Sequence, residues 1–196
     1  PVPLPPPRLP EIPDSMISDF LKRVKVQESQ NKNVGNTRSS AFGPYQFTQD
    51  TWNQLIKSNP ELSHLKPMDR LHPAAQEMAA PYHARHIANV YQQNDIPVTP
   101  ETLRMGWFLG PAGGAHFMKG MADNPDTPAA QLVHPGQITP NREMFQGKDG
   151  QLVTAHELFN TMTGQLAPPE KKPQTTLLDQ ILASKQQDPG LVPRKS

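Results

Sequence analysis

The chain has 196 residues with 24 prolines, 12 glycines and no cysteine, which is the length of one ordinary domain and excludes disulfides, a thiolate nucleophile and cysteine-bound zinc. Its 19 Lys and Arg against 18 Asp and Glu give a net charge of +1, which disfavours nucleic-acid binding through a basic surface. The mean hydropathy of −0.65 and the lack of long apolar stretches predict no membrane span.

Proline is concentrated at the two ends of the chain. Residues 1–13 (PVPLPPPRLPEIP) contain seven of the 24 prolines, and residues 168–196 contain five more. Because proline-rich sequence favours extended chain, residues 14–167 are predicted to form the folded unit. The chain lacks an initiator methionine and a signal-peptide pattern, so we expect an excerpt or a processed product.

Helical periodicity begins directly after the proline-rich lead. With Asp14 or Ser15 as N-cap, a helix is predicted to run to about Glu28. Its apolar face consists of Ile17, Phe20, Leu21 and Val24. Residues 29–47 lack this period and are rich in Asn, Ser and Gly, which predicts a loop.

Two further helices are expected before residue 99. Thr48 is predicted to cap one that ends before Pro60, with Trp52, Leu55 and Ile56 on its apolar face. His72-Pro73 begins a longer helix that Pro81 is expected to kink. The predicted apolar face of this helix is Ala75, Met78, Ala79, Tyr82, His86 and Val90.

The remaining elements are also helical. Thr99-Pro100 opens a helix that closes at Gly110, a weaker one covers residues 112–122, and Thr127-Pro128 starts a short one. After a tight turn at residues 147–150, Thr154 and Glu157 form a capping box for a helix carrying Leu158, Phe159 and Met162. Since no sustained two-residue alternation occurs, the predicted fold class is all-α.

Glu28 is the most informative single residue. Continuing the apolar face of the first helix one turn beyond Val24 reaches position 28, so this carboxyl is predicted to face the core at the helix C-terminus. Burial and the negative end of the helix dipole both disfavour the carboxylate and should raise its pKa, which suits a general acid. From position alone, a glutamate turned to water at a frayed helix end is the competing interpretation.

Three short segments carry a resemblance to a known family. Glu28-Ser29 is followed by Gly43-Pro44-Tyr45-Gln46 and then by Gly106-Trp107-Phe108-Leu109-Gly110-Pro111. Their order and spacing resemble lytic transglycosylases of the soluble, goose-lysozyme-like class, which have Glu-Ser, Gly-Leu-Met-Gln-type and Ala-Tyr-Asn-x-Gly-Pro elements. The resemblance covers about residues 15–122 and implies a lysozyme-like helical domain with a glycan-binding cleft.

The third segment departs from the family at two positions. Trp107 replaces the tyrosine that commonly hydrogen-bonds the catalytic carboxyl, and Phe108 replaces the asparagine. Because an indole N–H donates but cannot accept, we expect the hydrogen bond that orients Glu28 to come from elsewhere, with Tyr45 or Tyr82 as suppliers.

The resemblance implies that Glu28 is the one acid and base that cleaves the β-1,4 bond between MurNAc and GlcNAc in peptidoglycan. Glu28 would protonate the linking oxygen and then take the proton of the sugar's own 6-hydroxyl, which gives 1,6-anhydroMurNAc. Such substrate-assisted cleavage is a recognised exception to the use of two carboxyls. The expected glycan-binding set is Ser29, Ser40, Gly43, Tyr45, Gln46, Tyr82, Trp107 and Phe108, with core packing as the competing interpretation for its aromatic members.

Other candidate residues favour ordinary structural roles. His83 and His86 have the spacing of two metal ligands, but no acidic or sulfur ligand nearby completes a set, and no metal or cofactor is expected. Asp50 would be the second carboxylate of a hydrolase, yet an aspartate in the first turn of a helix is already explained by the helix dipole.

The expected organisation has four parts: a proline-rich lead (1–13), a catalytic domain (14–125), a helical extension packed on it (126–167) and a tail with an amphipathic helix at Leu177–Leu182 (168–196). Partners would be glycan strands, plus proteins bound through the lead and tail. Residues 141–166 resemble a C-terminal extension seen beside such domains in phage virion proteins, so the expected location is the bacterial periplasm or cell envelope, or a phage virion acting there. A water-using muramidase and a structural component without turnover remain alternatives.

Overall fold

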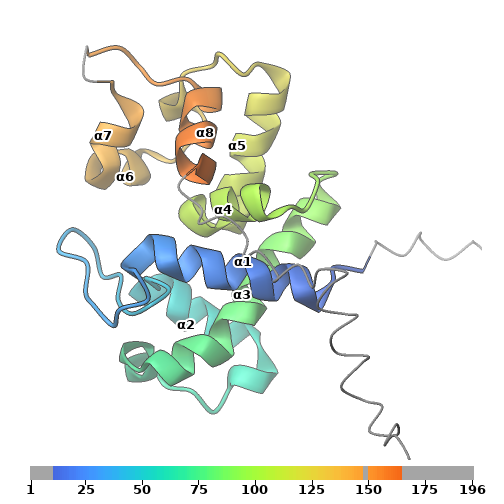
Figure 1. Cartoon of the computed structure of the whole chain (residues 1–196), viewed down its shortest axis with the longest axis vertical. Helices are drawn as coiled ribbons and strands as arrows, with labels where there is room; N and C mark the ends of the chain where they lie inside the picture. Colours follow the sequence, from blue (N-terminus) through green and yellow to red (C-terminus); the bar gives the residue numbers. More distant parts are fainter. Residues whose placement is uncertain (1–10, 148–149, 165–196) are drawn as a thin grey trace, which may run out of the picture.

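The computed structural model describes residues 11–147 and 150–164 and is built almost entirely from helices (Figure 1). Their bounds are α1 Asp14–Ser29, α2 Gln49–Ser58, α3 Pro73–Gln93, α4 Pro100–Leu109, α5 Pro111–Asp123, α6 Pro135–Ile138, α7 Arg142–Phe145 and α8 Ala155–Gly164. Short 3-10 helices are η1 Pro60–Leu62, η2 Pro67–Leu71, η3 Ala129–Gln131 and η4 Thr139–Asn141. Within the described residues β structure is limited to isolated bridges, so the predicted all-α class is confirmed.

The helix starts follow local chemistry with one exception. The hydroxyls of Thr48 and Thr99 accept from backbone N–H groups of the first turns of α2 and α4, as predicted. Thr154 and Glu157 form the expected capping box. The prediction for α1 is wrong, because its N-cap is Pro13 and no side chain caps it.

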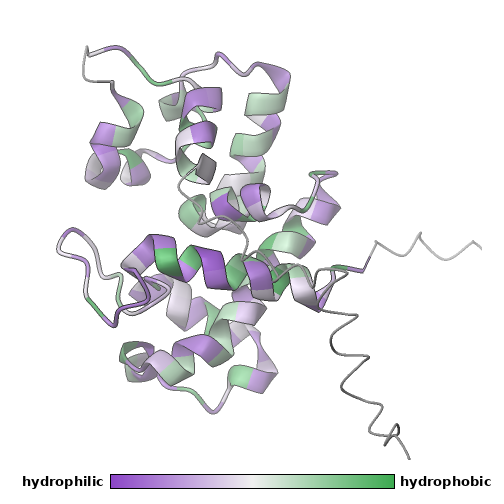
Figure 2. Cartoon of the chain, viewed as in Figure 1, coloured by the Kyte–Doolittle hydropathy of each residue, from purple (hydrophilic) through white to green (hydrophobic). Residues whose placement is uncertain are grey.

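Two hydrophobic clusters fill the interior. The first is aromatic-rich, and its largest members include Phe20, Trp52 and Tyr91. The second includes Met105, Phe117, Phe145, Leu158 and Met162. In Figure 1, α1 and α2 lie on one side of α4 and α5 to α8 on the other, whereas α3 extends to the level of α4 and contacts α5 as well; Figure 2 shows hydrophobic and hydrophilic residues alternating along the helices. Helix α4 serves both clusters, since Leu103 belongs to the first and Leu109 to the second.

The face that helix α3 buries matches the predicted one only in part, because Ala75 and Ala79 are buried and Tyr82 and Val90 are half-buried, as expected. Met78 is 49% exposed, and His86 also lies at the surface, although both were expected on the apolar face. The buried side consists of Ala75, Gln76, Ala79, Ala80, His83, Ala84, Ile87, Ala88 and Tyr91. Because α1, α2, α4 and α5 all contact α3, small alanine side chains rather than the larger amphipathic ones meet the neighbouring helices. The helix continues through Pro81.

Within the extension predicted at residues 126–167, α8 packs on α4 and α5. The second cluster therefore contains residues from both sides of position 125, and the boundary there stays a prediction. Residues 1–10 of the expected lead, and the tail with its helix at Leu177–Leu182, lie outside the described residues. None of the described helices is long and apolar enough to span a membrane.

Candidate functional site

Glu28 lies in the last turn of α1, one turn beyond the fully buried Val24. The helix ends directly afterwards because Gln30 adopts a left-handed conformation with φ of 54°. The Glu28 side chain is 20% exposed, so part of it remains at the surface. Burial raises its pKa above the ordinary value, as expected, and this favours the protonated acid.

Arg104 of α4 is the partner of this carboxyl. Its Nη1 lies 3.0 Å from Glu28 Oε1, and its side chain is only 5% exposed. The guanidinium charge lowers the pKa of Glu28 and so opposes the effect of burial. Within the described part of the chain, Arg104 Nε and Nη1 have no hydrogen-bond partner, so the contact is an ion pair without an aligned hydrogen bond.

The suppliers expected to orient Glu28 make other contacts. The Tyr45 hydroxyl donates to Glu77 Oε2 at 2.7 Å, and Trp107 Nε1 donates to the Tyr45 carbonyl at 3.3 Å. Tyr82 is half-buried on α3 against the first cluster. The expectation for Tyr45 is therefore wrong, and the side chain that meets Glu28 is a cation rather than a tyrosine.

The turn that carries Gly43 and Gln46 folds against the end of α1. The hydroxyl of Ser29, the residue after Glu28, donates to the Pro44 carbonyl at 2.8 Å. Gly43 has φ of 82°, where a side chain is strained. The Gln46 amide nitrogen donates to the Gly43 and Val34 carbonyls, so this group stabilises the turn from within.

Two buried polar side chains hold this turn in place. The Gln76 amide accepts from the Tyr45 N–H at 3.1 Å and donates to the Phe42 carbonyl at 2.8 Å. Arg70 Nη1 donates to the carbonyls of Ser40 and Phe47 at 2.7 and 3.0 Å. Since these carbonyls lie on both sides of the turn, Arg70 and Gln76 together determine its shape.

An aromatic cluster joins the turn to α4. The Trp107 ring lies 6.0 Å from that of Tyr45, 5.5 Å from Phe47 and 4.8 Å from His83, between ring centroids. Tyr45 is only 2% exposed, so the free ring face expected for stacking on sugars is absent. Core packing is the correct interpretation of Tyr45, and the half-buried Trp107 retains some exposed surface.

The other predicted binding residues are more dispersed. Ser40 is exposed, and its hydroxyl accepts from the Gln49 N–H at the start of α2. Phe108 is half-buried against the second cluster. Asp50 is exposed in the first turn of α2, consistent with a role at the helix start.

The two histidines of α3 behave differently from each other. His83 is 6% exposed and packs edge-on against Phe47 and Trp107, whereas His86 is exposed. Burial, with a smaller contribution from His86, lowers the pKa of His83 to about 4, so it is neutral at physiological pH. No group of three metal-ligating side chains occurs among the residues that the structure describes.

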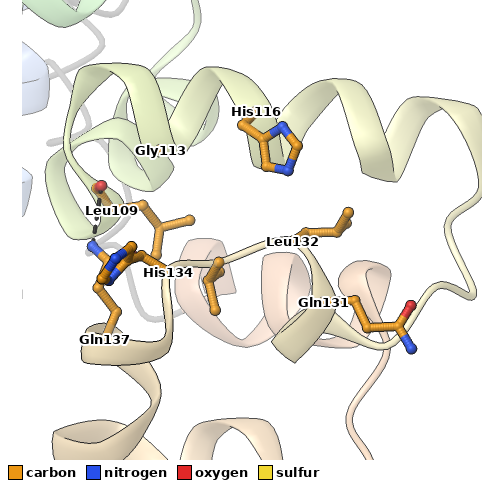
Figure 3. Close-up of a pocket in the computed structure, with 8 residues that line it drawn as sticks. Leu109, Gly113, His116, Gln131, Leu132, His134 and Gln137 are labelled. Carbon is orange, nitrogen blue, oxygen red and sulfur yellow. Dashed lines mark hydrogen bonds between the residues drawn. The ribbon is translucent and has the colours of Figure 1, made fainter.

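A surface pocket of about 600 Å³ lies away from Glu28, between α5 and residues 131–137. Figure 3 shows His116 of α5 above the segment that carries Leu132 and His134, with Gln137 donating to the Leu109 carbonyl. None of the predicted site residues lines this pocket. The candidate site is therefore the Glu28 carboxyl with its contacts, and this pocket is not part of it.

Arg104, Arg70 and Gln76 were missed by sequence reasoning. Arg104 is the one charged residue in the stretch from Thr102 to Gly114, and a lone charge among apolar helix residues was a readable signal of burial. No equivalent signal marks Gln76, because glutamine is common on helix surfaces.

No family model matches the chain, and no curated protein matches it in sequence. The three motif segments, and the contacts that the structure gives them, are therefore the features that bear on function.

Proposed function

We propose that the chain is a peptidoglycan lytic transglycosylase with a lysozyme-like helical domain and Glu28 as its acid and base. One observation carries the proposal: a largely buried carboxyl with a raised pKa lies at the end of α1, the second motif segment is bonded to the neighbouring Ser29, and the third contacts the second through Trp107. Ser29 bonds the turn at Pro44, and α4 supplies both Arg104 beside Glu28 and Trp107 beside Tyr45.

The electrostatics support a mechanism with a single carboxyl. Among the described residues, the charge that acts on Glu28 is the cation Arg104 rather than a second carboxylate. Glu28 gives its proton to the glycosidic oxygen, which leaves with the electron pair of the broken C1–O bond. The N-acetyl group of MurNAc stabilises the positive centre, and the 6-hydroxyl then forms the new bond to C1 and returns its proton to Glu28.

The proposed substrate and location follow from this reaction. Glycan strands of peptidoglycan are the partner, in the bacterial periplasm or envelope or from a phage virion. Ser29, Gly43, Gln46 and the half-buried Trp107 stay the proposed glycan-binding residues, whereas the buried Tyr45 packs against Trp107.

A structural component without turnover is the second candidate. Its support is specific: a buried cation beside Glu28 favours the ionised form, which cannot donate a proton. A water-using muramidase is the third, and it differs from the first only in its product.

Purified sacculi and the Glu28→Gln variant test the proposal. We expect wild type to release products with a 1,6-anhydroMurNAc end, which mass spectrometry finds lighter by one water than a reducing end. Glu28→Gln should retain its helical circular dichroism and release no products, because an amide cannot donate the required proton.

Asp50→Asn is the matched control, since it makes the same chemical change on an exposed helix start and should leave product release unchanged. Release by Glu28→Gln at the wild-type rate would refute the assignment. Reducing ends would identify a muramidase, and sacculus binding without any product would identify the structural role.

A further inference from the structure

Arg104 is buried in a way that fold stability alone does not explain. Its side chain is 5% exposed, and its Nε and Nη1 lack hydrogen-bond partners among the described residues. A buried cation with unused donors costs free energy, and an apolar residue of similar size would often pack at least as well. The contact that distinguishes Arg104 is the ion pair with Glu28.

We propose that Arg104 is a positioning residue that supplies the counter-charge for Glu28 whenever its carboxyl is ionised, and that it sets the pH range over which Glu28 can alternate between acid and base. This inference rests on the proposed function of Glu28 and deepens it.

The charge changes during the reaction explain why such a residue is needed. When Glu28 gives its proton to the glycosidic oxygen, a carboxylate forms in a largely buried position, where it is costly without a partner. Arg104 Nη1 already lies 3.0 Å from Glu28 Oε1, so the negative charge of the carboxylate is compensated as it develops. When the 6-hydroxyl returns a proton to Glu28, the pair becomes a neutral acid beside a cation.

The other charged groups around this end of α1 have partners of their own. Lys25 pairs with Glu77 of α3 at 3.0 Å. Arg23 of α1 pairs with Glu101 of α4 at 3.7 Å. On α3, His83 is neutral at physiological pH.

The other side chains described for this region are either uncharged or form an ion pair with a residue other than Glu28. Gln27 donates its amide to the Met162 carbonyl of α8, and Ser29 donates to the Pro44 carbonyl of the turn. Arg38, from the loop after α1, pairs with Glu143 of α7. Among the described residues, Arg104 is thus the charged group that acts on the ionisation of Glu28.

Removing this charge has two opposite effects on turnover. Without a cation nearby, Glu28 is a weaker acid, so kcat falls at low pH while KM is unchanged. The same change keeps Glu28 protonated to higher pH, so the alkaline limb of the kcat profile moves upward by about one pH unit or more. If Arg104 had a merely structural role, its removal would lower kcat without moving the alkaline limb of the pH profile.

The experiment compares Arg104→Met, Arg104→Gln and Arg104→Lys with wild type. The Glu28 carboxyl is titrated by carbon NMR in each full-length protein, and kcat is measured against pH on solubilised glycan strands. Arg23→Met is the matched control, because it removes a cation that joins the same two helices without contacting Glu28. Circular dichroism identifies the folded variants. If Arg104→Met does not fold, Arg104→Gln provides the neutral variant for the titration.

We expect Glu28 to titrate about one unit or more higher in the neutral variants and to titrate near the wild-type pH in Arg104→Lys and Arg23→Met. An unchanged titration in a folded neutral variant, or an equal shift in Arg104→Lys, would overturn the inference. Because the NMR titration requires no turnover, a protein that is inactive but shows the shift would contradict the proposed function and leave the Arg104 pair established.

Discussion

Two buried arginines show how the same side chain serves different purposes in two regions of this molecule. Around Arg70, the guanidinium donates to backbone carbonyls on both sides of the turn that carries Gly43. Around Arg104, the guanidinium meets the Glu28 carboxyl instead. Neutral acceptors do not titrate, so Arg70 stabilises a shape at any ordinary pH, whereas Arg104 has a partner whose charge can be switched.

The first prediction tests the structural arginine. In Arg70→Met, the carbonyls of Ser40 and Phe47 lose their donor while Phe47 remains buried, so the free energy of unfolding should fall by about 2–5 kcal/mol. Urea denaturation followed by circular dichroism measures this loss.

In Arg70→Met we also expect the titration of Glu28 to be unchanged, because the regions around Arg70 and Arg104 are then independent. A stability equal to wild type would mean that the turn does not depend on Arg70. A shift in the Glu28 titration would mean that the two regions are coupled rather than separate.

The second prediction concerns His83, which packs between the two regions. Its pKa of about 4 lies below the 6.5 of an exposed histidine, so the folded state resists protonation. The unfolded chain binds the proton more readily below pH 6.5, so stability present above that pH is lost as the pH falls toward 4, by roughly 3 kcal/mol in total.

Thermal or urea unfolding between pH 7 and 4 measures this loss in wild type and in His83→Phe. The variant should lose less stability over the range, because it has no imidazole to protonate, whereas exposed His86→Gln should change the loss much less, because His86 makes the smaller contribution to the lowered pKa of His83. Equal slopes in wild type and His83→Phe would assign the pH dependence to other groups.

The third prediction concerns Arg38, a surface arginine with which the two buried arginines can be compared. Arg38 Nη1 lies 2.6 Å from Glu143 Oε1 and links the loop after α1 to α7, but the two side chains are 66% and 65% exposed. Solvent screening makes such pairs weak, so this pair should give the smallest stability change of the three.

A double-mutant cycle of Arg38→Gln and Glu143→Gln measures the interaction. We expect a small coupling that disappears at high salt, because exposed charges are screened. A coupling that persists at high salt would show that the loop and α7 are held together as one unit.

The sequence predicted most of the fold correctly because helix signals are local. Threonine caps, prolines in first turns and the apolar spacing in α1 depend on residues within a few positions of one another. The face of α3 is predicted only in part, because four neighbouring helices cover the helix and alanine gives little periodic signal. Which residues of such a helix are buried depends on its surroundings rather than on its own pattern.

The candidate site divides in the same way. The sequence by itself determined that Glu28 lies at the end of a helix one turn beyond Val24, and that a glycine-containing turn follows it. Only the tertiary structure decided that Arg104, 76 positions further along the chain, meets that carboxyl, and that the Tyr45 hydroxyl bonds Glu77 instead. The reason is physical: periodicity places a side chain on a face, but the charge beside it comes from another helix, and that charge shifts its ionisation.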